Sequence, residues 1–410
     1  MIRDPLTAGT NSIRLLRTRR FGAFWFASLL SNVGTWMQSV AEPWLLLSIG
    51  GSSFALGLDA FAMNAPFWIL VLLGGFMADR GDRSKIIYFF QGIQTLCPLV
   101  ILGLIASGHI TVLLIIALSL IVGITDALSS PALSSLLPSM VDEQDIKPAL
   151  ALNSMQFNLS RVLGPAIAGL VMKSYGFAWC FGANAVSYVP FFLSIYWLRP
   201  PAGSRVPQTS IREEPGSAMA AIRAIVASGR TRWALLSIVG TGLFCGPLIT
   251  FSPLIVKGAL HADVSQFGTV LTAFGIGGTL GPVLLLFVTQ RVNPIRVSLS
   301  AAIACGVLIV AASQVGAVWQ LGVVLVGSGF ALTVANTSAN TFLQTHATDQ
   351  NRGQTASLFM LAMRGGMSVG NLATGVLITI SGVQRTLIVN GLLAIAVQGF
   401  IFRRLSRRTE

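Results

Sequence analysis

The chain alternates long apolar runs with short polar or basic connections from residue 21 to residue 402. A helix needs about 20 mostly apolar residues to cross a bilayer. On that measure the pattern predicts twelve spans, at residues 21–48, 57–78, 86–107, 110–130, 149–172, 176–198, 233–256, 264–289, 294–313, 317–343, 353–380 and 384–402. The expected fold class is therefore an all-α membrane protein with twelve transmembrane helices.

A long polar segment, rich in proline and arginine, divides these spans into two sets of six. We expect an N-terminal six-helix lobe (residues 1–198), a cytoplasmic linker (199–232) and a C-terminal six-helix lobe (233–410). Within the linker, residues 218–226 have apolar positions at helical spacing. That stretch is either a short helix on the membrane surface or part of a solvated linker.

The two halves share a glycine pattern. A shift of 206 residues places Gly164 on Gly370 and Gly169 on Gly375, and a shift of 213 residues aligns the second span with the eighth. Internal repeats are typical of transporters whose substrate site lies between the two halves. The layout therefore predicts a two-lobed transporter with its site at the lobe interface.

The distribution of charge predicts the orientation. Only 10% of the residues are charged, against about 25% in soluble domains, yet the net charge is +13. Most basic residues lie in the two termini and in the connections after even-numbered spans; the exceptions are Lys173, Lys257, Arg385, Arg161 and Arg364. Basic connections stay in the cytoplasm, so both termini are expected there. No base-reading helix accompanies these charges, which argues against nucleic acid as a partner.

The first span carries polar residues at helical spacing, among them Asn32, Gln38 and Glu42. Such a stripe on an apolar helix indicates a groove that holds water. Glu42 lies about 9 Å from the outer end of the span, at about 1.5 Å per residue. It either accepts protons, attracts a cationic substrate group, or is a carboxylate that reaches the membrane interface.

Three further charges fall inside spans: Asp126 in the fourth, Arg161 in the fifth and Arg364 in the eleventh. Charges in the bilayer core are costly and usually face protein or a watery cavity. Asn158 lies one turn before Arg161, and the shift of 206 residues places it on Arg364. The two arginines either pair with Asp126 or Glu42, or bind an anionic substrate. Arg161 is alternatively a structural clamp in a buried pair.

The connection between the second and third spans is short and basic. It holds Gly75, Asp79, Arg80 and Arg83 in the spacing G-x-x-x-D-R-x-x-R. This pattern resembles the loop at the same place in the major facilitator superfamily. The resemblance implies twelve helices in two lobes and alternating access. Asp79 and Arg83 would then hold the lobes together at the cytoplasmic ends of spans four and eleven when that side is shut.

Other segments are similar to the bacterial efflux branch of this superfamily that includes the enterobactin exporter; they are residues 34–38, 131–138, 151–154 and 357–367. The resemblance implies export. The pair Gly164-Pro165 also resembles a pattern of the superfamily's antiporters. Proline kinks a helix and glycine permits close packing, so the pair is either a gate element or ordinary packing. One departure is Ser119, at a place where many proton-driven members carry an arginine.

These features together predict a secondary transporter. We expect it to export a small organic compound, siderophore- or drug-like, in exchange for protons, as a monomer in the bacterial cytoplasmic membrane. A lysophospholipid or other lipid-like substrate is the alternative. Four isolated cysteines, three scattered histidines and the absence of a phosphate-binding loop predict no metal, no cofactor and no direct use of ATP. A membrane-embedded enzyme would need a nucleophile with its base, which the spans lack.

Overall fold

The computed structural model describes residues 14–197, 229–288, 292–348 and 352–406, and every regular element within these ranges is helical. The expected all-α fold is confirmed. The expected surface helix at residues 218–226 lies outside the described residues. So does most of the segment 199–232 that we expected to be a linker, although the first helix of the second half already begins at Gly229, inside that segment.

The helices of the first half are α2 (Arg19–Ser48), α3 (Ser53–Asn64), α4 (Phe67–Arg80), α5 (Arg83–Ala106), α6 (Val112–Leu136), α7 (Ile146–Tyr175) and α8 (Ala178–Trp197), with two short 3-10 turns, η1 (Leu137–Met140) and η2 (Glu143–Asp145), before α7. Those of the second half are α10 (Gly229–Cys245), α11 (Pro247–Thr250), α12 (Ser252–Leu254), the π-turn η3 (Ile255–Ala259), α13 (Val264–Val288), α14 (Pro294–Ala312), α15 (Val318–Thr345), α16 (Arg352–Ser381) and α17 (Val383–Ser406).

Proline explains where two of the predicted spans are interrupted. The second span is divided into α3 and α4 at Pro66, and the seventh is divided into α10, α11, α12 and η3, with Pro247 and Pro253 at its breaks. Proline has no backbone N–H and so interrupts the helical hydrogen bonds. Other helices begin at a capping side chain: Asp82 accepts hydrogen bonds from two backbone N–H groups at the start of α5.

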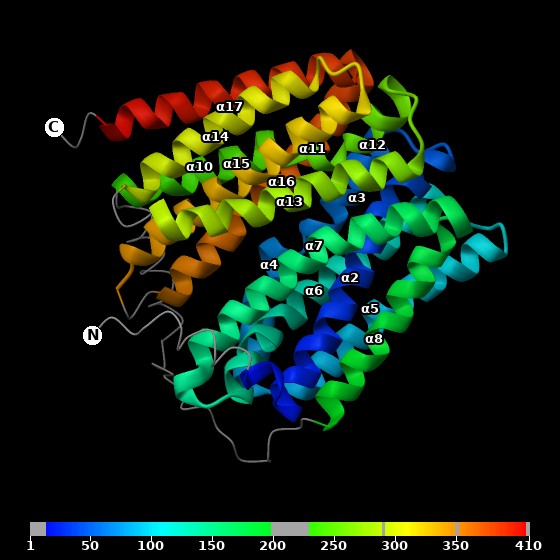
Figure 1. Cartoon of the computed structure of the whole chain (residues 1–410), viewed down its shortest axis with the longest axis vertical. Helices are drawn as coiled ribbons and strands as arrows, with labels where there is room; N and C mark the ends of the chain where they lie inside the picture. The colour runs from blue at the N-terminus through cyan, green and yellow to red at the C-terminus, as the bar shows by residue number, and fades with distance from the viewer. Residues whose placement is uncertain (1–13, 198–228, 289–291, 349–351, 407–410) are drawn as a thin grey trace.

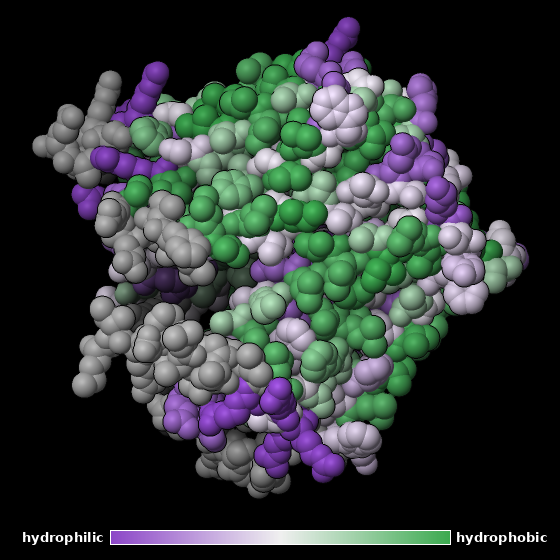
Figure 2. All heavy atoms as spheres, viewed as in Figure 1, coloured by the Kyte–Doolittle hydropathy of each residue, from purple (hydrophilic) through white to green (hydrophobic). Residues whose placement is uncertain are grey.

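The helices form two bundles that lie side by side (Figure 1). Helices α2 to α8 pack with one another, and α10 to α17 form the second bundle. Across the interface α7 packs on α13, and α3 packs on α16. We call the end of the molecule where α2 begins and α17 ends the termini end, on the left of Figure 1, and the opposite end the far end. The bundles meet at the far end and diverge toward the termini end, where Figure 2 shows a hollow between them.

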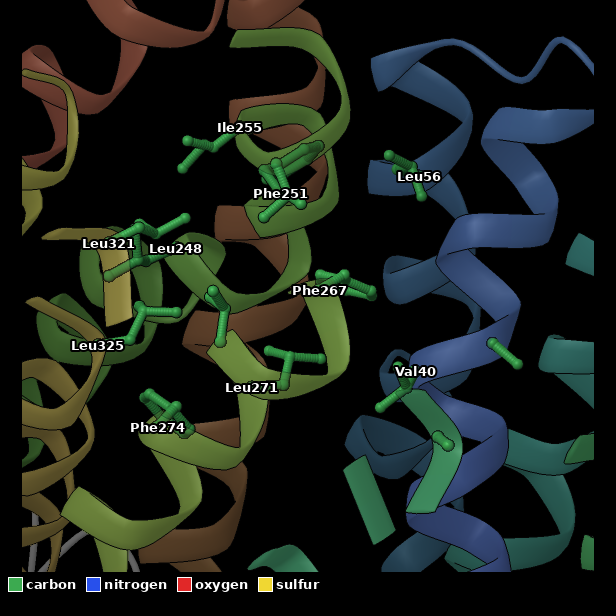
Figure 3. Close-up of a cluster of buried hydrophobic side chains, with 14 of the residues drawn as sticks. Val40, Leu56, Leu248, Phe251, Ile255, Phe267, Leu271, Phe274, Leu321 and Leu325 are labelled. Carbon is green, nitrogen blue, oxygen red and sulfur yellow. The ribbon is translucent and has the colours of Figure 1, made fainter. Parts of the chain in front are cut away.

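A continuous apolar core joins the two bundles toward the far end. Figure 3 shows Val40 and Leu56 of the first bundle near Phe267 and Leu271 of α13, and all four are buried. Many large apolar side chains instead point outward; Ile69 is 77% exposed. An apolar surface of this extent suits lipid and not water. The protein is a multi-pass membrane protein.

Three long helices lack an uninterrupted apolar stretch. Within the described residues, nine helical segments are long and apolar enough to span a membrane. Helices α2, α7 and α16 are not among them, although each has 30 residues. They carry Glu42, Arg161 and Arg364 respectively. These polar helices contribute most of the site described next.

Candidate functional site

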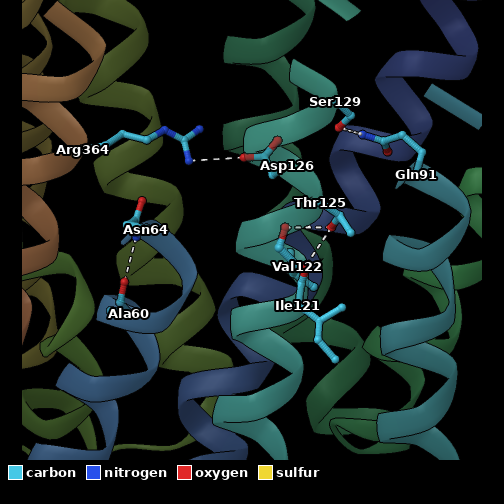
Figure 4. A network of polar contacts seen from close by, with 9 residues as sticks. All are labelled: Ala60, Asn64, Gln91, Ile121, Val122, Thr125, Asp126, Ser129 and Arg364. Carbon is cyan, nitrogen blue, oxygen red and sulfur yellow. Dashed lines mark hydrogen bonds and ion pairs between the residues drawn. The ribbon is translucent and has the colours of Figure 1, made fainter. Parts of the chain in front are cut away.

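An ion pair connects the two bundles. Arg364 Nη1 on α16 donates to Asp126 Oδ2 on α6 at 3.3 Å (Figure 4), and the two side chains are 30% and 31% exposed. The same guanidinium lies 3.8 Å from the ring centre of Phe67 on α4. A partly exposed ion pair contributes about 1 kcal/mol or less. Breaking this ion pair therefore costs little free energy.

Arg161 also reaches across the interface, but it has no acidic partner within the described part of the chain. It stands midway along α7, and its guanidinium carbon lies 4.6 Å from the ring centre of Phe274 on α13 and 5.9 Å from that of Trp36 on α2. Its Nε atom is buried without a hydrogen-bond partner among the described residues. Sequence considerations allowed either arginine to pair with Asp126 or Glu42. Within the described ranges, only Arg364 does.

Glu42 belongs to a hydrogen-bonded network inside the first bundle. Its Oε1 accepts from Ser119 Oγ of α6 at 2.6 Å, and its Oε2 accepts from Gln38 Nε2 at 3.0 Å. The Gln38 carbonyl in turn accepts from Asn184 Nδ2 of α8 at 2.6 Å. The network joins three helices, so the Glu42 carboxylate points into the bundle rather than toward the membrane interface.

A second carboxylate lies beside this network. Asp59 of α3 is only 8% exposed, its Oδ1 has no hydrogen-bond partner among the described residues, and it lies close enough to Glu42 and Ser119 to interact with both. Two carboxylates near one hydroxyl in a low-dielectric interior repel each other, and a bound proton removes that repulsion. The pair is therefore suited to bind and release a proton.

Sequence considerations missed parts of this network. Ser119 only marked a departure from proton-driven relatives, and Asn184 gave no signal of its own. Ser119 occupies the place where those relatives carry arginine, and here its hydroxyl donates to Glu42. The serine at this place was the sequence signal that could have located the network.

The two asparagines predicted for the substrate path, Asn158 and Asn32, belong neither to the Glu42 network nor to the ion pair of Arg364. Asn158 Nδ2 donates to the Ser154 carbonyl in its own helix at 2.9 Å. Asn32 is half-buried and makes no side-chain hydrogen bond to a described residue. Neither is brought to Glu42 or to Arg364, and their place on a substrate path stays a prediction.

The described side chains of Arg80 and Arg83, at the basic turn between α4 and α5, make local contacts. The Arg80 guanidinium carbon lies 4.0 Å from the ring centre of Phe76, and Arg83 Nε donates to the Ala78 carbonyl at 3.4 Å. Gly75 has open space around it. The Asp79 side chain lies outside the described part of the structure. The predicted latch to α6 and α16 is therefore a prediction still.

The Gly164-Pro165 pair sits where α7 contacts two other helices. Gly164 packs directly against Trp36 of α2, which leaves no space for a side chain. One turn on, Gly169 meets Gly268 of α13, and a Cβ on Gly268 would lie 2.8 Å from the Pro165 carbonyl oxygen. Helix α7 remains continuous through the proline. The segment thus packs within its own bundle and against the other one.

The far end is closed by small residues. A Cβ on Gly57 of α3 would lie 3.2 Å from the Cα atom of Gly375 on α16, and one on Gly169 would lie 3.1 Å from the Cα atom of Gly268. Beside the first contact, Ser53 Oγ and Thr379 Oγ1 are 2.9 Å apart. Direct backbone contact of this kind seals the interface at the far end.

A known family matches almost the whole chain. The family described as transmembrane secretion effector, within the major facilitator superfamily, matches residues 10–409. The chain belongs to this family. Its members are transporters and not enzymes, so this membership confirms both the resemblance and the prediction that the protein is not an enzyme.

Curated relatives of this transporter handle siderophores. It is 23% identical to the staphyloferrin A transporter of Staphylococcus aureus over 398 residues, covering 94% of this chain and 97% of the relative. It is 25% identical to the enterobactin exporter EntS of Citrobacter koseri over 380 residues, covering 89% and 86% of the two chains. Transport and an efflux relationship are thereby supported.

Solved structures show the same fold. A bacterial homologue of the human lysosomal transporter Spinster, inward-facing and unoccupied, matches with a TM-score of 0.73 at 16% identity and covers 94% of this transporter and 96% of that chain. A bacterial homologue of the iron transporter ferroportin, inward-facing, matches with a TM-score of 0.71 at 15% identity and covers 94% and 98%. The major facilitator fold is confirmed.

Proposed function

We propose that this transporter exports a small organic compound, siderophore- or drug-like, in exchange for protons and by alternating access. The observation that carries the proposal is the unequal closure of the bundle interface. Glycine backbones touch across the interface at the far end, whereas the bundles diverge toward the termini end. A two-lobed transporter must alternate between such a state and its opposite.

The proposal includes an orientation. The basic residues lie mainly at the termini end, and basic connections remain in the cytoplasm. Both termini would then be cytoplasmic in the bacterial inner membrane, and the hollow would open to the cytoplasm, ready to receive a compound for export. The lobes at residues 1–198 and 233–410 would move as units joined by the segment 199–232, within a single chain acting as a monomer.

Proton coupling is supported by the Glu42 and Asp59 pair. The two carboxylates lie near Ser119 in the interior of the first bundle, whereas Asp126 is partly exposed and is paired with Arg364. A proton that binds to this pair neutralises one charge, which changes how α2, α3 and α6 pack. Proton binding in one state and release in the other would drive the cycle.

A disulfide across the far end tests alternating access. Ser53 and Thr379 lie on different bundles with their oxygen atoms 2.9 Å apart, so cysteines at both positions are placed to form a disulfide. The native cysteines, Cys97, Cys180, Cys245 and Cys305, are all buried, so an oxidant meets the introduced pair first. The assay uses everted vesicles with an imposed pH gradient and a panel of enterobactin, staphyloferrin A, ethidium and a lysophospholipid.

Oxidation should stop transport by the Ser53→Cys/Thr379→Cys variant, and a reductant should restore it. The single variant Ser53→Cys is the control and should transport normally under oxidant. Unchanged transport by a fully cross-linked protein would refute alternating access. The member of the panel that moves identifies the substrate class, and transport of the lysophospholipid alone would favour the lipid-like alternative.

A further inference from the structure

Arg161 has no acidic partner among the residues that the structure describes. Asp126 is paired with Arg364, and Glu42 is occupied by Ser119 and Gln38. No carboxylate within the described residues lies within ion-pair distance of Arg161. Arg161 is half-buried, and its Nε atom is fully buried. A cation without an acidic partner is costly inside a membrane protein, and a protein retains one where something else neutralises it.

The fold makes room for this guanidinium between the bundles. A Cβ on Gly275 of α13 would lie 2.6 Å from the Arg161 carbonyl oxygen, and one on Gly278 would lie 2.9 Å from Arg161 Nη1. Glycine at these two positions therefore lets α7 approach α13 and lets the side chain extend across the interface. The hydroxyl of Thr333 on α15 lies at the same place, 3.2 Å from the Gly278 Cβ position.

The surroundings of the guanidinium are aromatic. Phe274 lies under it, Trp36 lies near it, and the Trp36 ring packs edge-on against Phe157 with ring centres 6.1 Å apart. A guanidinium on an aromatic ring keeps N–H donors at its edge, in a fork that matches a carboxylate. The site thus offers one cationic fork and several apolar faces, halfway along α7.

We propose that Arg161 binds the carboxylate of an organic anion whose apolar or aromatic body lies against Trp36 and Phe274. This inference rests on the proposed transport function and names its substrate class. Because Arg161 belongs to the first bundle and Phe274 to the second, the anion contacts both. A substrate placed in this way senses the relative position of the bundles, as alternating access requires.

Equilibrium binding to the purified full chain tests the site. The probes are 2,3-dihydroxybenzoate, its neutral methyl ester and lysophosphatidylglycerol, measured by calorimetry. The variants are Arg161→Gln, Arg161→Lys and Gly278→Ala, whose new methyl group displaces the guanidinium without removing its charge. Arg385→Gln is the matched control, since it removes one positive charge from an exposed position at the far end.

The wild type should bind the acid and not the ester. Charge-assisted hydrogen bonds of this kind correspond to roughly ten- to hundredfold in affinity, so Arg161→Gln should lose about that much. Arg161→Lys and Gly278→Ala should lose less, and Arg385→Gln nothing. Equal binding of the ester, unchanged binding by Arg161→Gln, or no binding of either anion by the wild type would overturn the proposal. Binding of lysophosphatidylglycerol that depends on Arg161 would support the anion site and assign its occupant to lipid.

Thermal unfolding separates this role from a structural clamp. A clamp predicts a lower Tm for Arg161→Gln without ligand. A ligand site predicts a Tm that is unchanged or raised, because an unpaired charge has been removed, together with loss of stabilisation by the acid. Binding is measured without transport, so failure of the cross-linking test would refute alternating access and leave the anion site standing. Normal binding of the acid by Arg161→Gln would refute the anion site and leave alternating access standing.

Discussion

Gly169 of α7 and Gly268 of α13 meet backbone to backbone where the two bundles close. A Cβ on Gly268 would lie 2.6 Å from the Gly169 Cα atom, whereas one on Gly169 would lie 3.1 Å from that of Gly268. The contact is tight in both directions but tighter for Gly268. Direct packing of this kind holds the far end shut.

A graded series of alanine substitutions should open this contact. Gly268→Ala must push the helices apart and should reduce oxidative cross-linking of the Ser53→Cys/Thr379→Cys pair, with a smaller effect for Gly169→Ala. Overpacking costs about 1 to 3 kcal/mol, which changes the ratio of two states by about fivefold to about a hundredfold.

Gly92 of α5 has open space around it, so Gly92→Ala is the matched control and should leave cross-linking unchanged. If Gly268→Ala cross-links as well as the wild type, the glycine contact does not determine closure of the far end.

A second glycine pair closes the far end in the same way as Gly169 and Gly268. Gly57 of α3 meets Gly375 of α16, and the 206-residue shift that relates the halves places Gly169 on Gly375. Sequence comparison of the halves therefore located one member of each contact. It did not locate Gly57 or Gly268, because a glycine used for close approach to a distant helix leaves no trace in its local pattern.

The apolar runs were sufficient to predict the helices and the fold class, because a bilayer demands long apolar helices with internally satisfied backbones. The site was less accessible to sequence. Asp126 and Arg364 are far apart in the chain, and which arginine takes the carboxylate depends on the geometry of two bundles. Asp59 and Ser119 likewise gain meaning only when α3 and α6 are placed beside Glu42.

The ion pair between Asp126 and Arg364 should affect transport more than stability. Because both side chains are partly exposed, Asp126→Asn should change the free energy of unfolding by about 1 kcal/mol or less. It should nevertheless slow transport, since the pair links the bundles in the state described here. The reversed pair, Asp126→Arg with Arg364→Asp, should recover part of the rate. Failure of the reversed pair, with a normal Tm, would show that the charges act separately.

Glu42→Gln should uncouple transport from the pH gradient. Glutamine retains an acceptor for Ser119 or Gln38 and keeps the shape of the side chain, but it cannot exchange a proton at this position. Binding of substrate and Tm should be close to those of the wild type, while the response of transport to an imposed gradient disappears. The same response in Glu42→Gln and in the wild type would leave Asp59 as the proton site or exclude coupling through this network.

Ser119→Ala tests the role of the hydroxyl that lies between Glu42 and Asp59. It removes the hydroxyl that donates to Glu42 at 2.6 Å and leaves both acids in place. The variant should remain coupled to protons, but the pH at which transport is half-maximal should move, because hydrogen bonding to a carboxylate favours its charged form. A profile of rate against pH, with Ser134→Ala at an exposed position of α6 as control, measures the shift. An unmoved profile would mean that Ser119 only packs.

The turn between α4 and α5 should stabilise only the state in which the termini end is shut. In the state described here Arg83 bonds to the Ala78 carbonyl and Arg80 lies over Phe76, so neither connects the bundles. If Asp79 and Arg83 hold the termini end shut, Asp79→Asn should impair transport while leaving substrate binding largely intact. It should also raise cross-linking of the Ser53→Cys/Thr379→Cys pair, because weakening the opposite state shifts the population toward this one. An unchanged transport rate, or unchanged cross-linking with impaired transport, would show that the turn is not a latch.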